Sequence, residues 1–250
     1  MSGAPRAASI SEFPVRSFDI DAYGYLSPAR IAGYFQQAAS ESADALGFGL
    51  TDLNRRGLTW VVVRQQWELD EALVLGDALC VETWPSGIER RAALRDFRLF
   101  KEGREVGRAV TSWLVLDMTS RRPVLPSTIL GETFQTQGLH VVLPAIEPIA
   151  VLKAHSEQRR FGVRYSDIDV NHHVTNASYV GWAIDAIGAS TWSDCRLATF
   201  DVQFMAECGL GASVVSRATP QGADCWLHSI VREDDQKELA RAISTWKRKK

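Results

Sequence analysis

An internal repeat is the feature that most constrains how this chain can fold. The segment that starts at Arg16 aligns without a gap with the segment that starts at Arg164, at an offset of 148 (164 − 16). A second match pairs REVGRAVTSW (104–113) with KELARAISTW (237–246) at an offset of 133 (246 − 113), so the second copy has shorter internal loops. The identical pairs are Arg16/Arg164, Asp19/Asp167, Ile20/Ile168, Asp21/Asp169, Ala29/Ala177, Gly33/Gly181, Ala38/Ala186, Glu105/Glu238, Arg108/Arg241, Ala109/Ala242 and Trp113/Trp246. Ordered matches at both ends of each copy indicate a duplicated folding unit rather than chance similarity.

Each copy predicts a short strand, a polar turn, one helix and then several strands. In the first copy Ser27 offers a helix cap and Pro28 fits the first helical position. Apolar residues then recur at helical spacing, at Ile31, Tyr34, Phe35 and Ala38. In the second copy Thr175 takes the cap position, and the same stripe is formed by Tyr179, Trp182, Ala183, Ala186 and Ile187.

The strands follow one another without intervening helices, which predicts an antiparallel sheet wrapped around the helix of each copy. In the first copy they are expected at 59–69, 78–84, 90–100 and 105–117, with a hairpin turn at 101–104 that corresponds to 234–237 in the second. The predicted class is α+β with two such units in tandem. The expected divisions are a flexible N-terminus (1–11), a first unit (12–125), a linker (126–158) and a second unit (159–250).

The bulk composition excludes several classes of function. A formal net charge of −2 provides no global attraction to nucleic acid or to anionic membranes. The start of the chain lacks the pattern of a secretory signal, and no apolar run is long enough to span a bilayer, so we expect a cytoplasmic protein. The four cysteines show no metal-binding spacing and are expected to be reduced thiols, mostly in the core. No glycine pattern matches a phosphate-binding loop.

The polar cluster of the second copy is the candidate reactive centre. Asp169, Asn171 and His173 lie two residues apart, so in an extended segment their side chains leave on one side, next to the start of a helix. Such groups can orient water and stabilise an oxyanion. The first copy has Tyr23 and Tyr25 at the positions of Asn171 and His173 and keeps only the acid, as Asp21. The shared acid therefore also fits a role in the turn. By strand parity His172 points the other way.

Two further candidates lie in FDVQFMAECG, a predicted strand followed by a glycine-rich turn. From the residues alone, Glu207 is better explained as an exposed glutamate at a strand end than as a reactive group. Cys208 is either a nucleophile activated by His173 or a buried, inert thiol.

The chain resembles the fatty acyl-ACP thioesterases along nearly its whole length, through TWVVVR, RPVLP, AEC (206–208) and above all DVNHHVTN (169–176). Family members typically have asparagine where Thr175 stands, a position at which threonine can also cap a helix. The resemblance implies a double hotdog fold and, without a cofactor, hydrolysis of long-chain acyl-ACP to free fatty acid, which ends fatty acid synthesis. It places Glu207 beside Asn171 and His173 as a general base that activates water.

The resemblance also implies an acyl-chain pocket in the first copy, with Gly33, Phe35 and Val61–Val63 as candidate lining residues. Acyl carrier protein is acidic and would dock on arginines, of which the candidates are Arg90, Arg91, Arg95, Arg98, Arg121, Arg122, Arg159 and Arg160. A monomer or a homodimer is compatible with two fused units. The alternatives are an acyl-CoA thioesterase, a hotdog module that binds acyl thioesters without cleaving them, and an enoyl thioester hydratase.

Overall fold

A computed structural model describes residues 9–130, 140–142, 144, 145 and 147–249 of the chain. Its contacts divide the chain into two compact units. Unit 1 comprises Met1–Pro14, Tyr34–Trp67 and Gly76–Pro144, and unit 2 comprises Val15–Gly33, Glu68–Leu75 and Ala145–Lys250. Unit 2 therefore contains the second copy together with the polar turn and the start of the helix of the first copy, the last two residues of strand β2 and the residues that follow them.

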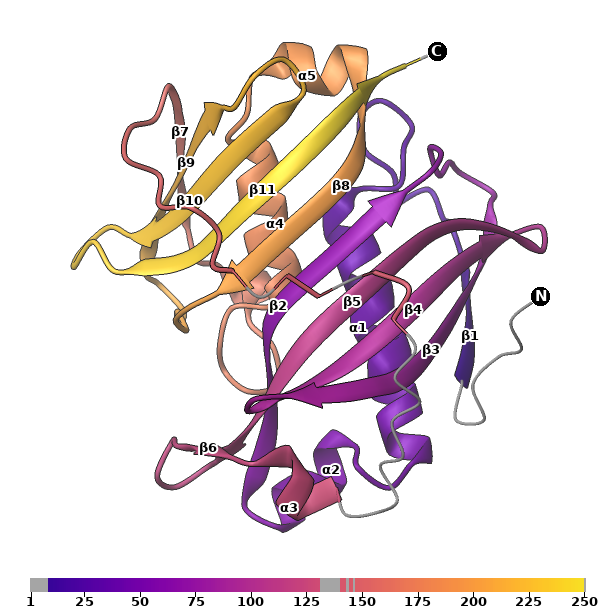
Figure 1. The fold of residues 1–250 in the computed structure, drawn as a ribbon. Helices are drawn as coiled ribbons and strands as arrows, with labels where there is room; N and C mark the ends of the chain where they lie inside the picture. The colour runs from indigo at the N-terminus through magenta and orange to yellow at the C-terminus, as the bar shows by residue number, and fades with distance from the viewer. Residues whose placement is uncertain (1–8, 131–139, 143, 146, 250) are drawn as a thin grey trace. The chain divides into compact units, whose positions relative to one another are not determined.

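Unit 1 is an antiparallel sheet with the strand order β1-β3-β4-β5-β2, and β6 pairs with β5. Figure 1 shows helix α1 lying along one face of this sheet. The strands are β1 (Ser9–Pro14), β2 (Leu58–Leu69), β3 (Ala78–Glu89), β4 (Ala92–Lys101), β5 (Arg104–Asp117) and β6 (Pro123–Val124). The helices are α1 (Pro28–Ala45), of which the part after Gly33 belongs to this unit, α2 (Leu50–Arg55) and α3 (Pro126–Leu130).

The predicted long helix and all four predicted strands of the first copy are confirmed, whereas the short helices α2 and α3 were not predicted. Aromatic packing between α1 and the sheet forms the core: the ring of Phe35 lies 5.2 Å from that of Phe97 and 6.3 Å from that of Trp67. The hairpin turn is also as predicted, with Glu102 and Gly103 at φ of 52° and 74°. Such positive values suit the right-handed twist of the paired strands.

Strand β1 begins inside the segment 1–11 that was expected to be flexible. Its ladder with β3 starts at Ser9, which pairs with Thr83, so Ser9, Ile10 and Ser11 belong to the sheet. Residues 1–8 of that segment lie outside the described residues.

Arg95 was a candidate for docking acyl carrier protein, and its burial rules this out. Its side chain donates hydrogen bonds to Ser42 on α1 (2.9 Å) and to Thr83 on the neighbouring strand β3 (3.3 Å). Burial lowers the pKa of Arg95 to about 10, because the charged form loses its hydration. Arg98 is also largely covered, with 16% of its side chain exposed and with Glu82 and Glu105 as ion-pair partners. The other candidate arginines are exposed.

Unit 2 contains a second antiparallel sheet, with the order β8-β11-β10-β9-β7. Helix α4 lies along one face of it, as Figure 1 shows. The strands are β7 (Glu157–Gly162), β8 (Cys195–Phe204), β9 (Ser213–Pro220), β10 (Cys225–Arg232) and β11 (Glu238–Arg248). The helices are η1 (Tyr165–Asp167), α4 (Asn176–Asp185) and α5 (Ala189–Asp194). Each copy thus has the predicted sheet and central helix.

Parts of the predicted linker are bound to the two units. In unit 1, the buried carboxylate of Asp96 accepts a hydrogen bond from the Val141 backbone N–H (2.7 Å) and lies 3.0 Å from His140 Nδ1. In unit 2, Ile149 contacts Gln203 through its N–H (3.4 Å) and Arg241 through its carbonyl (3.2 Å). The predicted linker is therefore held at two places, by unit 1 at residues 140 and 141 and by unit 2 at Ile149.

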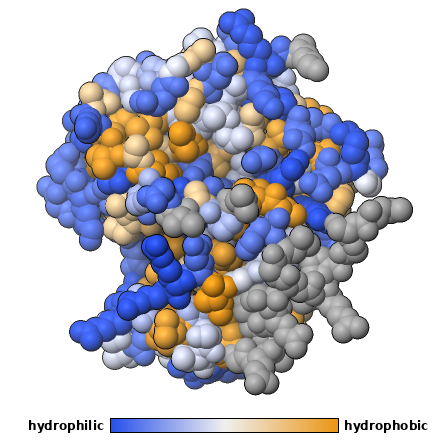
Figure 2. All heavy atoms as spheres, viewed as in Figure 1, coloured by the Kyte–Doolittle hydropathy of each residue, from blue (hydrophilic) through white to orange (hydrophobic). Residues whose placement is uncertain are grey.

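The surface is of mixed polarity. Figure 2 shows hydrophilic and hydrophobic side chains interspersed over the face drawn in Figure 1. Among the described residues, no helix is both long enough and apolar enough to cross a bilayer. All four cysteines are free thiols, but only Cys208 is buried, so the expectation that most of them lie in the core was wrong.

Candidate active site

Asp169 organises the polar turn of the second copy through its own carboxylate. Its Oδ1 accepts hydrogen bonds from the backbone N–H groups of Asn171 (2.8 Å) and His173 (3.4 Å), and its N–H donates to the His173 carbonyl (2.9 Å). Asn171 Nδ2 lies 3.5 Å from Asp169 Oδ2. The segment is therefore a tight turn, in agreement with the polar turn predicted before the helix, and not the extended segment from which the three side chains were expected to leave on one side. The three residues are grouped by this carboxylate, not by strand parity.

The backbone turns at His172, which has a φ of 63°. A positive φ costs an L-residue free energy, so this turn stores some strain. His172 is exposed.

Glu207 lies against this turn. The segment after β8 is attached to it by a hydrogen bond from the Val174 N–H to the Cys208 carbonyl (2.9 Å). This contact brings Glu207 Oε2 to 3.3 Å from His173 Nε2. The two side chains are 40% and 36% exposed, so a ligand can reach both from solvent. His173 and Glu207, which are far apart in sequence, are thus brought together, and Asn171 belongs to the same turn as His173.

The site is completed by the start of α4. The Thr175 hydroxyl accepts a hydrogen bond from the Ser178 N–H (3.2 Å), which confirms the predicted cap. The buried carboxylate of Asp167 accepts from the Arg164 N–H (2.8 Å), and its carbonyl accepts from the Thr175 N–H (2.8 Å). The first turn of α4, with its N–H groups and positive dipole end, is therefore held next to His173.

Cys208 is present at the site but is poorly suited to attack a substrate. Only 1% of the residue is exposed, and burial is the main cause that raises the pKa of its thiol. The reactive form of a cysteine is the thiolate, which a raised pKa disfavours. Arg232 opposes the shift without reversing it.

Sequence reasoning missed two residues of this region. Asp167 fixes the entry to the turn, and its identity with Asp19 in the repeat was a usable signal. The sequence pattern predicts Tyr179 only as part of the apolar stripe of the helix. Its ring does pack in the core, but its hydroxyl lies in the polar surroundings of Cys208 and Glu207.

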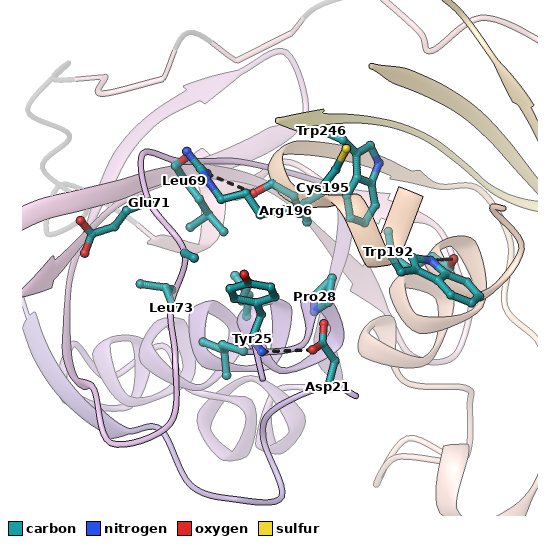
Figure 3. A pocket seen from close by; sticks show the side chains of 15 residues that line it. Asp21, Tyr25, Pro28, Leu69, Glu71, Leu73, Trp192, Cys195, Arg196 and Trp246 are labelled. Carbon is teal, nitrogen blue, oxygen red and sulfur yellow. Dashed lines mark hydrogen bonds between the residues drawn. The ribbon is translucent and has the colours of Figure 1, made fainter. Parts of the chain in front are cut away.

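The turn of the first copy repeats the same backbone hydrogen bonds without the same side chains. Asp21 Oδ1 accepts from the N–H groups of Tyr23 (2.8 Å) and Tyr25 (3.1 Å), and Asp21 N–H donates to the Tyr25 carbonyl (2.7 Å). A pocket lies against this first turn, as Figure 3 shows. It is lined mainly by apolar and aromatic side chains, including Leu73, Trp192 and Trp246.

Among the described residues, no cluster of three or more His, Cys, Asp or Glu side chains is arranged to hold a metal ion. The groups that this site offers for chemistry are the side chains of Asn171 and His173 from the turn, the Glu207 carboxylate from the segment after β8, and the N–H groups at the start of α4.

Comparison with known families matches both halves of the chain. Residues 8–132 match the acyl-ACP thioesterase N-terminal domain, and residues 151–248 match the acyl-ACP thioesterase C-terminal domain. A curated relative, palmitoyl-acyl carrier protein thioesterase of Gossypium hirsutum, is 25% identical over 95% of this chain and 63% of its own length. Oleoyl-acyl carrier protein thioesterase 1 of Arabidopsis thaliana is 23% identical over 95% of this chain and 75% of its own length. The chain thus spans less than two thirds of the first of these plant proteins.

Solved structures show the same fold. An acyl-ACP thioesterase from Bacteroides thetaiotaomicron superposes with a TM-score of 0.85 at 21% identity, over 96% of this chain and 98% of that one. The 12:0-ACP thioesterase from Umbellularia californica superposes with a TM-score of 0.86 at 22% identity, over 99% and 100%. The predicted double hotdog is confirmed, and by the match of both family domains the chain belongs to the acyl-ACP thioesterase family.

Proposed function

We propose that this protein hydrolyses the thioester between a fatty acyl chain and acyl carrier protein, releasing free fatty acid and the carrier thiol. The observation that carries this proposal is the 3.3 Å contact between His173 Nε2 and Glu207 Oε2 at a solvent-accessible turn. The contact lies at the start of a helix, where donors for an oxyanion are available. Membership of the acyl-ACP thioesterase family supports the same reaction.

In the proposed reaction Glu207 is the general base. Its carboxylate takes a proton from water as the water oxygen forms a bond to the thioester carbonyl carbon. The carbonyl oxygen becomes an oxyanion, stabilised by Asn171, His173 and the first turn of α4. When the intermediate collapses the carbon–sulfur bond breaks, and the leaving thiolate recovers the proton. The products are a fatty acid and a thiol, and no cofactor takes part.

Asp169 and Cys208 have secondary roles in this proposal. Asp169 holds the turn through Oδ1 and orients Asn171 through Oδ2. Because burial raises the pKa of Cys208, attack by water accounts for the reaction better than attack by this thiol.

The partner and the compartment belong to the same proposal. Acidic acyl carrier protein would dock on exposed arginines, for which Arg90, Arg91, Arg121, Arg122, Arg159 and Arg160 remain candidates. The acyl chain would occupy the pocket of the first sequence copy (12–125). The enzyme and its acyl carrier protein would be in the cytoplasm. The plant relatives carry names that place them in chloroplasts.

A thiol-release assay tests the proposal. Matched acyl-ACP and acyl-CoA substrates of several chain lengths are compared with the wild type and with the His173→Ala and Glu207→Gln variants. We expect turnover of acyl-ACP by the wild type and its loss in both variants. Faster turnover of acyl-CoA than of acyl-ACP would show that the protein is an acyl-CoA thioesterase. An acyl thioester that stays bound and uncleaved would indicate a binding module.

A further inference from the structure

A buried hydroxyl that has no acceptor among the described residues lies near Cys208 and Glu207 of the proposed active site. It belongs to Tyr179 on α4, a residue that is only 4% exposed. Its ring is fixed by edge contacts with Trp182 (5.4 Å between centroids) and Phe204 (5.9 Å). Among the residues that the structure describes, Tyr179 Oη has no partner at hydrogen-bonding geometry. The nearby Cys208 backbone N–H lowers the pKa slightly, but it is itself a donor and cannot accept the phenol proton.

Such a hydroxyl is unfavourable for folding. A hydroxyl that leaves water without gaining an acceptor costs free energy, whereas phenylalanine would pack the same ring without that cost. Core packing therefore explains the ring of Tyr179 but not its oxygen.

The surroundings of Tyr179 indicate where its proton can be used. Phe204, which contacts the ring, lies at the end of β8, three residues before Glu207. Cys208, which follows Glu207, accepts a hydrogen bond from the Val174 N–H and so is attached to the turn. Burial raises the pKa of the Tyr179 phenol strongly, and the nearby Cys208 and Glu207 raise it further. The phenol therefore stays protonated at neutral pH and can act as a donor.

We propose that Tyr179 is a positioning residue for thioester hydrolysis, which donates its unused hydrogen bond to the Glu207 carboxylate in the working enzyme. This inference rests on the proposed function. Because Oη is buried it cannot touch the substrate, so it acts through Glu207. A hydrogen bond from the Tyr179 hydroxyl would keep the Glu207 carboxylate ionised and oriented towards the water, while His173 faces the substrate.

Several titratable and charged groups surround this pair. On the turn they are His173 and Asp169, and on the same segment as Glu207 there is Cys208. Arg232, at the end of β10, and Asp234 and Asp235 beyond it are the charged groups that act on Tyr179 or Cys208 from the neighbouring hairpin. None of them is removed by a change from tyrosine to phenylalanine.

The test is the Tyr179→Phe variant, assayed as the full chain with acyl-ACP across pH. We expect kcat/KM at neutral pH to fall about tenfold and the acidic limb of its pH profile to move up by about one pH unit, because the ionised carboxylate loses a donor. Resistance to urea should stay equal to that of the wild type or increase, because a buried hydroxyl without an acceptor is gone. Tyr165→Phe is the matched control, since Tyr165 is 87% exposed, and it should leave rate, pH profile and stability unchanged.

An unchanged rate and pH profile in Tyr179→Phe, with an active wild type, would overturn the inference and leave the proposed function intact. A lower rate in Tyr179→Phe that is accompanied by lower stability, with no shift in the acidic limb of the pH profile, would also overturn the inference. That pattern would mean that the hydroxyl only stabilises the fold. Carbon-13 titration of the glutamate carboxyl groups provides a measurement that does not depend on turnover. The midpoint for Glu207 must move to higher pH in Tyr179→Phe, even if the wild type proves inactive on acyl-ACP.

Discussion

The two polar turns of this protein share a backbone and differ in chemistry. Around Asp21 and Asp169 the same carboxylate oxygen accepts the same two N–H groups, and in both turns the residue before the last one has a positive φ. In the first turn that residue is Gly24 (84°), and in the second it is His172 (63°). The hydrogen bonds show that the duplicated unit kept its geometry to the level of single atoms.

The same hydrogen bonds identify the counterpart, in the first copy, of each proposed catalytic residue. The Leu26 N–H donates to the Leu73 carbonyl (2.7 Å), as the Val174 N–H does to that of Cys208, so Leu73 corresponds to Cys208. The residue before Leu73 is Ala72, which therefore occupies the position of Glu207. The first turn thus has Tyr23, Tyr25 and Ala72 in place of Asn171, His173 and Glu207. The two turns therefore share their backbone geometry and differ in the side chains that could act in catalysis.

The largest expected effect tests whether only the second turn supports catalysis. Glu207→Ala and His173→Ala should each lower kcat for acyl-ACP by about a thousandfold, the range seen for loss of general acid–base groups. Tyr25→Phe, at the position of His173, should leave kcat within about twofold. Steady-state thiol release measures all three. Equal losses at both turns would mean that the two sites are not chemically distinct.

A second difference between the copies lies in the cores. The residue paired with Ala109 is Phe97, whereas the residue paired with the matching Ala242 is His228. His228 is fully buried and lies 2.9 Å from the Ser244 hydroxyl. Burial lowers its pKa to about 3, with a small opposing effect from the Ala183 backbone.

This histidine should make the protein sensitive to acid. The folded state holds His228 neutral while the unfolded chain takes up a proton near pH 6.5, so stability is complete above that pH and falls as the pH drops towards 3. The loss is about 1.4 kcal/mol per pH unit, or about 3 kcal/mol by pH 4. Urea unfolding of His228→Gln should show a flatter curve in this window. His155→Gln, at an exposed position, is the control and should follow the wild type.

The shared acids sharpen the comparison. Asp21→Ala and Asp169→Ala each remove two hydrogen bonds from backbone N–H groups to a carboxylate, and each should lower the free energy of unfolding by about 2 kcal/mol. Only Asp169→Ala should also reduce kcat, because only that turn positions Asn171 and His173. Unfolding and thiol-release measurements on the same preparations separate the two effects. A stable Asp169→Ala variant with lost activity would assign this acid to catalysis alone.

The helix caps should differ by the smallest amount. Thr175 Oγ1 accepts from the Ser178 N–H at 3.2 Å, whereas Ser27 Oγ lies at 3.4 Å from the Arg30 N–H. Thr175→Ala should therefore cost about 1 kcal/mol of stability and Ser27→Ala about half as much. Thermal unfolding can resolve the two values, and the reverse order would show that cap distance does not decide the cost.

The sequence predicted most of the fold because the repeat and the hydrophobic periodicity are both local patterns. The helices after Ser27 and Thr175 and the hairpin at 101–104 follow from capping and turn chemistry. The shape of the turn 169–173 could not be predicted from a spacing of two, because an aspartate that binds its own backbone competes with the extended form. The burial of Arg95 was also missed, since its partners Ser42 and Thr83 are distant in sequence.

Within the site, the spacing of Asn171 and His173 was visible in the sequence, but the approach of Glu207 was not. That approach depends on the pairing of the Val174 N–H with the Cys208 carbonyl, a tertiary contact. The resemblance to a family supplied Glu207, and the geometry gives it a physical basis.

The equal length of the two turns has a consequence for protein engineering. Since Arg16–Ala38 and Arg164–Ala186 align without a gap, grafting one reactive set onto the other turn requires no insertion or deletion. Three exchanges, Tyr23→Asn, Tyr25→His and Ala72→Glu, would rebuild the missing groups on a scaffold whose main chain already has the required form. The first copy is thus a suitable scaffold for engineering a second set of the proposed catalytic residues into the same chain.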